Sequence, residues 1–162
     1  MSGFSVKKAV ELAIRTERDG AEFYSDIAQS FSDNQDLAGI FNQLSSDEKA
    51  HEREFSSILK NMPDSDNVDA DSNAFYLLQA TSVSEFFKQD AIKNKTGLTP
   101  KDALLTALNF EKATLMHYHA LAEVLGETPQ LKGLIQAEKN HVAALMKVAI
   151  SDAQFRGLAD SW

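Results

Sequence analysis

Two copies of one short motif, Glu-Lys-x-His, constrain this chain more than any other feature of its sequence. The first copy places Glu48 three residues before His51. The second copy places Glu138 three residues before His141. In an α-helix, residues three apart project from the same face, one turn from each other. A carboxylate and an imidazole placed in this way can hold one metal ion together, so each copy predicts a helix that carries half of a metal site.

Apolar residues flank both motifs at helical spacing, which argues against solvated helix faces. Leu44 and Phe55 stand on either side of the first copy, and Leu134 and Leu145 stand on either side of the second. A carboxylate buried on such a face without a partner is very costly. A bound cation removes this cost, so a buried metal site explains the pattern better than an exposed surface does.

Two further glutamates, Glu17 and Glu111, lie among apolar residues on predicted helices just upstream of the two motifs. In four-helix bundles, one Glu from each of two helices and a Glu-x-x-His pair from each of the other two build a di-iron carboxylate site. We expect each ion to take one single Glu and one His, with the motif glutamates as bridges: Glu17 and His51 for one ion, Glu111 and His141 for the other, and Glu48 and Glu138 between them.

A weak internal repeat supports this arrangement. Residues 13–28 align with residues 107–122, and residues 44–58 align with residues 134–148. The alignment superposes the two single glutamates on each other and the two motifs on each other. Packing the two halves about a pseudo-twofold axis would therefore gather the six side chains at the centre of one bundle.

Tyr24 and Tyr118 each follow a single Glu by seven residues and are therefore expected on the same helix face, one layer away from the site. Two interpretations stay open for this pair. The tyrosines either donate hydrogen bonds to the ligand carboxylates, or they are core aromatics whose hydroxyl groups are satisfied elsewhere.

Four other polar residues near the motifs are not expected to be ligands. His117 and His119 lie on adjoining faces of one predicted helix, and we expect one of them to be exposed. Glu52 lacks a partner that carries a His, which favours an exposed position or an indirect contact with the site. Glu22 is expected on the surface.

Seven Gly and three Pro fall mostly between long stretches of helical periodicity. Ser5, Thr99-Pro100 and Thr128-Pro129 are expected helix starts, because they combine a capping side chain with a favourable first turn. Gly126 is an expected helix end. The predicted long helices cover about residues 5–31, 35–61, 99–125 and 128–155.

A long connection over about residues 62–98 joins the second and third long helices. Residues 74–96 within it are predicted to form a broken helix. Two successive bundle helices can run parallel only if a long connection links them. The tail from Arg156 has no assigned structure, and Trp162 could dock on the bundle or on a neighbouring subunit. The whole chain, residues 1–162, is predicted to form one all-α, four-helix bundle domain.

The composition of the chain limits its chemistry and its partners. The absence of Cys excludes disulfides, iron–sulfur clusters, Cys-based zinc sites and thiol catalysis within these residues. A net charge of −8 argues against nucleic acid and anionic membranes as partners. No apolar run reaches membrane-spanning length and no export signal is recognisable, so we expect a cytoplasmic location. Carboxylates with two imidazoles and no thiolate suit Fe or Mn, with Zn as a substitute.

In its order of motifs, the chain resembles the ferritin-like superfamily, and specifically the rubrerythrin-type di-iron domain, over essentially its whole length. The stretch EKAHEREF at residues 48–55 favours the rubrerythrin type. The resemblance implies a ferritin-like four-helix bundle with a long crossover between helices two and three. It also implies two iron ions held by the six side chains named above.

The chain departs from the rubrerythrin pattern in two respects. Rubrerythrins carry a C-terminal rubredoxin domain with four Cys, and this chain has none. They also have an extra carboxylate ligand one turn after the Glu of the third helix, where this sequence has Thr114. The remaining set is closer to the symmetrical site of bacterioferritin. Bacterioferritin places a haem-binding Met beside the Glu of its second helix, whereas this chain has Lys49, so haem is not expected.

The resemblance implies a redox protein that reduces hydrogen peroxide or dioxygen with electrons from two bound Fe(II) ions. Without a rubredoxin domain, an external donor such as a rubredoxin-like protein would return the electrons. Two alternatives stay open: a ferroxidase that handles iron as its substrate, and a non-enzymatic helical module stabilised by its metals. We expect a homodimer or a larger homo-oligomer.

Overall fold

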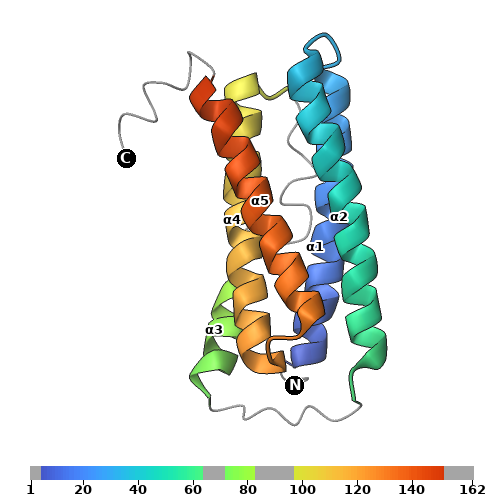
Figure 1. The fold of residues 1–162 in the computed structure, drawn as a ribbon, viewed down its shortest axis with the longest axis vertical. Coiled ribbons are helices and arrows are strands. Elements are labelled where there is room, and N and C mark those ends of the chain that lie inside the picture. Colours follow the sequence, from blue (N-terminus) through green and yellow to red (C-terminus); the bar gives the residue numbers. More distant parts are fainter. Residues whose placement is uncertain (1–4, 64–71, 83–96, 152–162) are drawn as a thin grey trace.

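The computed structural model describes residues 5–63, 72–82 and 97–151. Within these ranges the regular structure is helical, and no strand is present. Four long helices lie side by side, with one short helix at one end of them (Figure 1). The helices are α1 (Val6–Ser30), α2 (Gln35–Asn61), α3 (Asn73–Ser82), α4 (Pro100–Leu125) and α5 (Pro129–Ser151). The prediction of an all-α bundle with four long helices is confirmed.

Side-chain caps define the starts of the four long helices. In each case an oxygen of the capping side chain accepts a hydrogen bond from the backbone N–H three residues later, which satisfies a donor that the helix itself leaves free. These pairs are Ser5 with Lys8, Asn34 with Leu37, Thr99 with Asp102 and Thr128 with Leu131. Gly126 ends α4 with a φ of 87°, a conformation that a residue with a side chain rarely adopts.

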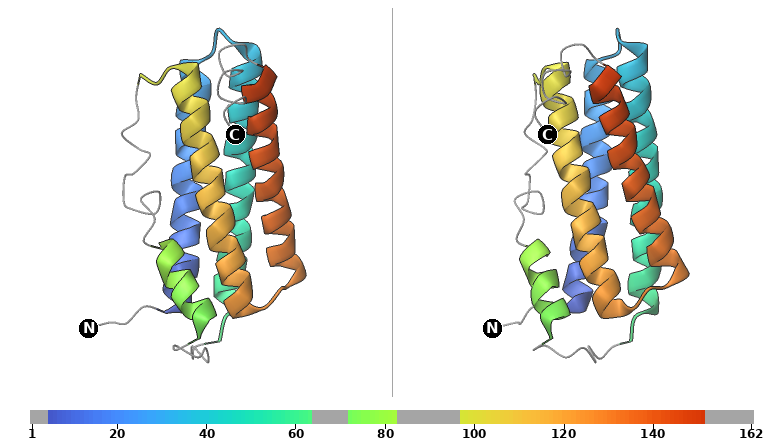
Figure 2. Two further views of the ribbon diagram at one scale, coloured as in Figure 1. Left: turned by 90° about the vertical axis from the view of Figure 1, so that its left-hand side faces the viewer. Right: turned by 60° about the vertical axis from the view of Figure 1, so that its left-hand side comes forward.

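The path of the chain explains the long connection. α1 and α2 form one antiparallel pair, and α4 and α5 form another (Figure 1). α2 ends at one end of the bundle and α4 begins at the other, so the two helices run parallel and the chain must travel the full bundle length between them (Figure 2). α3 lies in this connection and packs against α4 and α1.

Three predicted features lie partly or wholly outside the described residues. α3 accounts for the first part of the predicted broken helix, and residues 83–96 are not described. The predicted last helix is seen as far as Ser151, and its expected continuation to residue 155 is not described. The tail with Trp162 is likewise outside the described ranges.

The apolar core is divided into two clusters along the bundle axis. One cluster joins the end of α1 to the start of α2 and the start of α4, with Phe23, Phe41 and Phe110 among its members. The other joins the start of α1 to the ends of α2 and α4, with Phe55 and Leu121 among its members. The two clusters leave the middle of the bundle to a layer of buried polar side chains. In the described part of the chain, no helix combines the length and apolar character needed to cross a membrane.

Candidate metal centre

All six side chains predicted as metal ligands meet in the polar layer at the middle of the bundle. α1 and α4 supply one glutamate each, and α2 and α5 supply a glutamate and a histidine each. None of the six residues is more than 6% exposed to solvent. They are Glu17 of α1, Glu48 and His51 of α2, Glu111 of α4, and Glu138 and His141 of α5.

The Nδ1 atom of each imidazole faces three carboxylates. For His51, the distances from Nδ1 are 2.9 Å to Glu138, 3.3 Å to Glu48 and 3.5 Å to Glu17. The two rings stack with their centroids 5.3 Å apart. For His141, the distances from Nδ1 are 3.2 Å to Glu111, 3.4 Å to Glu48 and 3.8 Å to Glu138. Glu138 and Glu48 thus lie beside both histidines, whereas Glu17 and Glu111 each lie beside one.

Several buried nitrogen and oxygen atoms that could bind a metal have no hydrogen-bond partner among the described residues. They include both carboxylate oxygens of Glu17 and of Glu48, Oε1 of Glu138 and Nδ1 of His51. The contact between Nδ1 of His141 and Oε2 of Glu111 is a hydrogen bond, whereas the other short nitrogen–oxygen distances above join atoms that lie close together without the direction of a hydrogen bond. A buried polar atom without a partner costs about 1–3 kcal/mol, and more if it is charged. Donors that converge in this manner, with one atom from each of Glu48, His51, Glu138 and His141 within 4.8 Å of the others, fit a shared cation.

Electrostatics in the layer favour bound protons when no cation is present. Burial, followed by the nearby charge of Glu48, raises the pKa of Glu17 and Glu111 well above the usual range. Burial alone would lower the pKa of the two imidazoles, but the surrounding carboxylates raise it, to about 11 for His141. Burial alone would raise the pKa of Glu48, but its contacts with Glu17, His141 and His51 lower it. The imidazole protons must leave before these nitrogens can bind a metal.

The two tyrosines differ in their hydrogen bonds. The hydroxyl of Tyr24 donates to Oε1 of Glu111, across the bundle from α1 to α4. Tyr118 Oη is buried and has no partner among the described residues. The ring of Tyr118 packs against Phe55 with centroids 4.6 Å apart. The structure therefore places one tyrosine on a carboxylate of the cluster and leaves the other as a core aromatic.

Two further side chains touch the cluster, and neither contact was predicted. Oδ2 of Asp47 lies 3.2 Å from Nε2 of His141, on the side of the ring opposite the cluster. Oγ1 of Thr114 lies 3.0 Å from Oε2 of Glu138. Asp47 directly precedes the motif glutamate Glu48, and this acidic residue beside a ligand motif was the only sequence signal for the contact. Thr114 stood out only as a departure from the rubrerythrin pattern.

The remaining candidates lie away from the cluster. His117 is buried, with Nδ1 3.0 Å from Thr81 Oγ1 and Nε2 3.3 Å from the carbonyl oxygen of Ala9. His119 and Glu22 are exposed. Glu52 forms an ion pair with Arg18, whose guanidinium nitrogen lies 2.6 Å from the carboxylate.

Aromatic rings and close helix packing cover one side of the cluster. Tyr24 stacks on Phe41 at 5.9 Å and meets Phe110 edge to face at 6.0 Å. Gly20 faces the same ring: a Cβ at this position would lie 2.9 Å from two atoms of Phe110 and 3.6 Å from Cγ of Glu48. The absence of a side chain at Gly20 allows α1 to approach the cluster closely.

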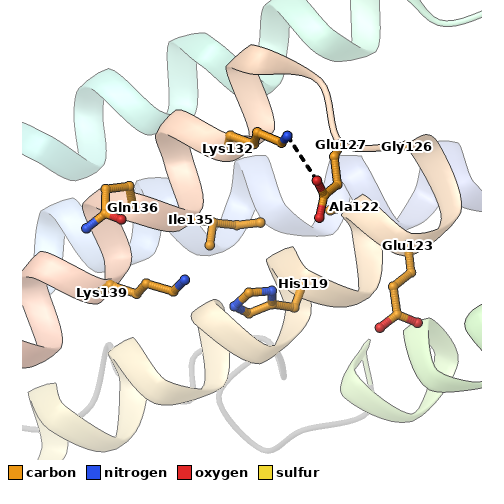
Figure 3. A pocket seen from close by; sticks show the side chains of 9 residues that line it. All are labelled: His119, Ala122, Glu123, Gly126, Glu127, Lys132, Ile135, Gln136 and Lys139. Carbon is orange, nitrogen blue, oxygen red and sulfur yellow. Dashed lines mark ion pairs between the residues drawn. The ribbon is translucent and has the colours of Figure 1, made fainter.

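A cavity of about 330 Å³ reaches the cluster at one point. It lies between α2 and the first turns of α5, and His51 is the only cluster residue among those that line it, which are His51, Glu54, Pro129, Gln130, Gly133 and Leu134. A second cavity, of about 590 Å³, lies between α4 and α5 near the turn that joins them and is lined by no cluster residue. Figure 3 shows Lys132 paired with Glu127 at the edge of this second cavity, so the charges of these two side chains neutralise each other.

Comparison with protein families finds a match to the family described as rubrerythrin over residues 8–149. Searches of curated proteins and of solved structures find no match. The matched span contains all six cluster residues and nearly all of the four long helices. Together with the bundle topology and the buried Glu/His cluster, this match shows that the chain belongs to the rubrerythrin family of ferritin-like di-iron carboxylate domains.

Proposed function

We propose that the protein is a non-haem di-iron redox protein that reduces hydrogen peroxide or dioxygen. The observation that carries the proposal is the buried convergence of four carboxylates and two imidazoles, several of whose donor atoms lack any partner in the described structure. This donor set, rich in carboxylate and without thiolate, suits iron or manganese. Glu17 with His51 and Glu111 with His141 would hold the two ions, with Glu48 and Glu138 between them.

When bound there, a pair of ferrous ions supplies two electrons and polarises the O–O bond of an oxidant. Reduction of one hydrogen peroxide consumes these two electrons and two protons and yields two water molecules. The chain contains no Cys and therefore no thiol of its own that could return the electrons. A separate reductant, such as a rubredoxin-like protein, completes the cycle.

The protein itself contributes orientation and exclusion of bulk water. Burial, followed by the charge of Glu111, raises the pKa of Tyr24, so its hydroxyl keeps its proton and holds the carboxylate of Glu111 in one orientation. Asp47 fixes the ring of His141 from the side opposite the cluster. The rings of Phe41 and Phe110 close the layer on one side.

The test starts with protein purified without oxygen and loaded with Fe(II). Metal analysis should give two irons per chain, and stopped-flow mixing with one equivalent of peroxide should oxidise them rapidly, with turnover when a reductant is added. Glu17→Ala should lose the reaction. Glu22→Ala, on an exposed face of the same helix, is the matched control and should retain it. Iron that binds but is oxidised by neither peroxide nor dioxygen would refute the redox proposal and favour a structural role for the metals.

One observation favours a second candidate, a ferroxidase that oxidises iron as its substrate. Thr114 occupies the place where rubrerythrins carry an additional carboxylate ligand, and its hydroxyl lies on Glu138 without adding a carboxylate to the set. The resulting six-donor site is like that of bacterioferritin. Oxidation of many Fe(II) ions per chain with dioxygen, together with a large hollow assembly in sedimentation, would favour this function. Sedimentation as a monomer or dimer would exclude iron storage.

A further inference from the structure

We propose that the two ends of the cluster are unequal. The end formed by Glu111 and His141 binds the first iron ion tightly, whereas the end formed by Glu17 and His51 binds the second ion weakly and exchanges it through the cavity at His51. This inference rests on the metal centre of the proposed function and concerns the order and strength of binding, not the redox reaction.

Two side chains outside the ligand set support the first end, and a third contacts the shared ligand Glu138. The Tyr24 hydroxyl donates to Glu111, and the Asp47 carboxylate lies 3.2 Å from Nε2 of His141. The Thr114 hydroxyl lies 3.0 Å from Glu138. The contacts to Glu111 and His141 hold these two ligands in position before an ion arrives.

The internal repeat identifies the positions at which the second end should have the same supports. Tyr118 corresponds to Tyr24, but its hydroxyl reaches no partner in the described structure. Ala137, which directly precedes Glu138, corresponds to Asp47 and has no carboxylate. Gly20, three residues after its single Glu, corresponds to Thr114 and has no hydroxyl. The two supports of the first end are therefore missing from the second, and the shared Glu48 has no counterpart of the Thr114 contact.

The buried atoms without partners show the same asymmetry. Both oxygens of Glu17 and Nδ1 of His51 lack a hydrogen bond among the described residues, whereas no atom of Glu111 or His141 does. Nothing described holds the side chains of the second end in one orientation, so an ion that binds there must order them itself. Loss of a single group that orients a metal ligand typically weakens metal affinity about 10–100-fold. Two such differences predict binding steps that are at least about tenfold apart.

The cavity gives the weaker end a route to solvent. His51 lines this cavity and His141 does not. At its rim, Nε2 of Gln130 donates to the Glu54 carboxylate at 2.5 Å, which ties the start of α5 to α2. A Cβ added at Gly133 would meet open space. Gly133 itself lines the cavity, so a bulky residue at this position begins in open space at the cavity wall.

Anaerobic calorimetric titration with Fe(II) tests the inequality, and diffraction at the iron absorption edge locates the first ion. The wild-type protein should bind two ions in two steps, and with one equivalent of Fe(II) the anomalous signal should lie between Glu111 and His141. Two equivalent sites, or a first ion between Glu17 and His51, would overturn the inference.

Two substitutions change the supports in opposite directions. Asp47→Ala should weaken the tight step about 10–100-fold, and Asp47→Asn, which keeps an acceptor oxygen, should weaken it less. Ala137→Asp, which supplies the missing carboxylate, should strengthen the weak step. Ala143→Asp introduces the same charge at an exposed position of the same helix and should leave both steps unchanged. Equal weakening of both steps by Asp47→Ala, or equal effects of the two Asp substitutions, would overturn the inference.

The exchange route is tested by the rate at which a chelator removes iron from the loaded protein. Gly133→Phe should slow release of the weakly bound ion severalfold. Gly39→Phe is the matched control, because Gly39 is also an exposed helical glycine whose added Cβ meets no atom, and α2 carries it far from the cavity. Equal release rates in the two variants would refute the route.

The outcome separates this inference from the proposed function. Unequal binding of two ions without reaction toward peroxide or dioxygen would refute the redox proposal and leave the inference standing. Two equivalent sites with a rapid reaction would do the reverse. Failure of the folded protein to bind Fe(II) would overturn both.

Discussion

The contact between Gly20 and Phe110 allows a stability change to be worked out from the structure. A Cβ at Gly20 would lie 2.9 Å from two atoms of the Phe110 ring, closer than real Cβ contacts. The ring is fully buried and packs against Tyr24, so it has little room to move. Overpacking of a core usually costs about 1–3 kcal/mol. Replacement of a helical Gly by Ala gains roughly 1 kcal/mol from helix propensity. Gly20→Ala should therefore destabilise the protein by about 0–2 kcal/mol.

Gly39→Ala gives the matched reference. Gly39 is helical and exposed, and a Cβ there meets no atom within 4 Å. This variant should gain the full propensity term of about 1 kcal/mol, which raises the melting temperature of a protein of this size by about 2–4 °C. The two alanine variants should thus differ by about 1–3 kcal/mol in free energy of unfolding.

Urea denaturation of the metal-free protein, followed by circular dichroism, measures this difference without a contribution from metal binding. A second variant localises the cause. In a Phe110→Leu background the ring atoms are gone, so Gly20→Ala should become as favourable as Gly39→Ala. If Gly20→Ala stabilises the wild-type protein as much as Gly39→Ala does, the close approach of α1 to the ring is refuted.

Three further predictions concern titration and hydrogen bonding. Burial lowers the pKa of His117 to about 4, so the neutral imidazole contributes stability that is fully present above its ordinary pKa near 6.5. The free energy of unfolding should therefore fall by about 3 kcal/mol as the pH drops to 4. Urea denaturation across this pH range should show a smaller fall for His117→Gln. Because the pKa of His141 is raised to about 11, its proton must leave when metal binds, so calorimetry in buffers of different ionisation enthalpy should show proton release and weaker Fe(II) binding at lower pH. Tyr24→Phe should cost about 1–3 kcal/mol because it leaves a buried acceptor on Glu111, whereas Tyr118→Phe should be neutral or stabilising; equal costs in denaturation would contradict the assigned contacts.

Local signals explain why the helix limits could be predicted from the sequence. α2 spans Gln35–Asn61 and α4 spans Pro100–Leu125, close to the predicted limits. Proline, glycine and capping residues act on the backbone within one turn, so their effect can be recognised without knowledge of the fold. The placement of Glu48 and His51 together follows from the same short-range geometry, because residues three apart share a helix face.

Contacts between distant segments explain what the sequence did not reveal. Asp47 and His141 lie 94 residues apart, and no spacing rule connects them. Tyr24 and Tyr118 occupy equivalent positions of the repeat, yet only one reaches a carboxylate. That difference depends on how far each helix is shifted and rotated against its neighbours. Such offsets are set by the packing of the whole bundle rather than by the local sequence.

The polar layer between two apolar clusters also has a consequence for how the helices align. Sliding α5 by one turn would move Glu138 along the axis by about 5.4 Å, away from its partners and toward apolar side chains of the neighbouring helices, such as Leu44 or Phe55 of α2. A carboxylate buried without a partner among apolar side chains is very costly, so a bundle with a shifted helix is disfavoured even though its apolar side chains would still pack together. The same acidic side chains that suit the molecule for binding metal ions thus help to set the alignment of its helices.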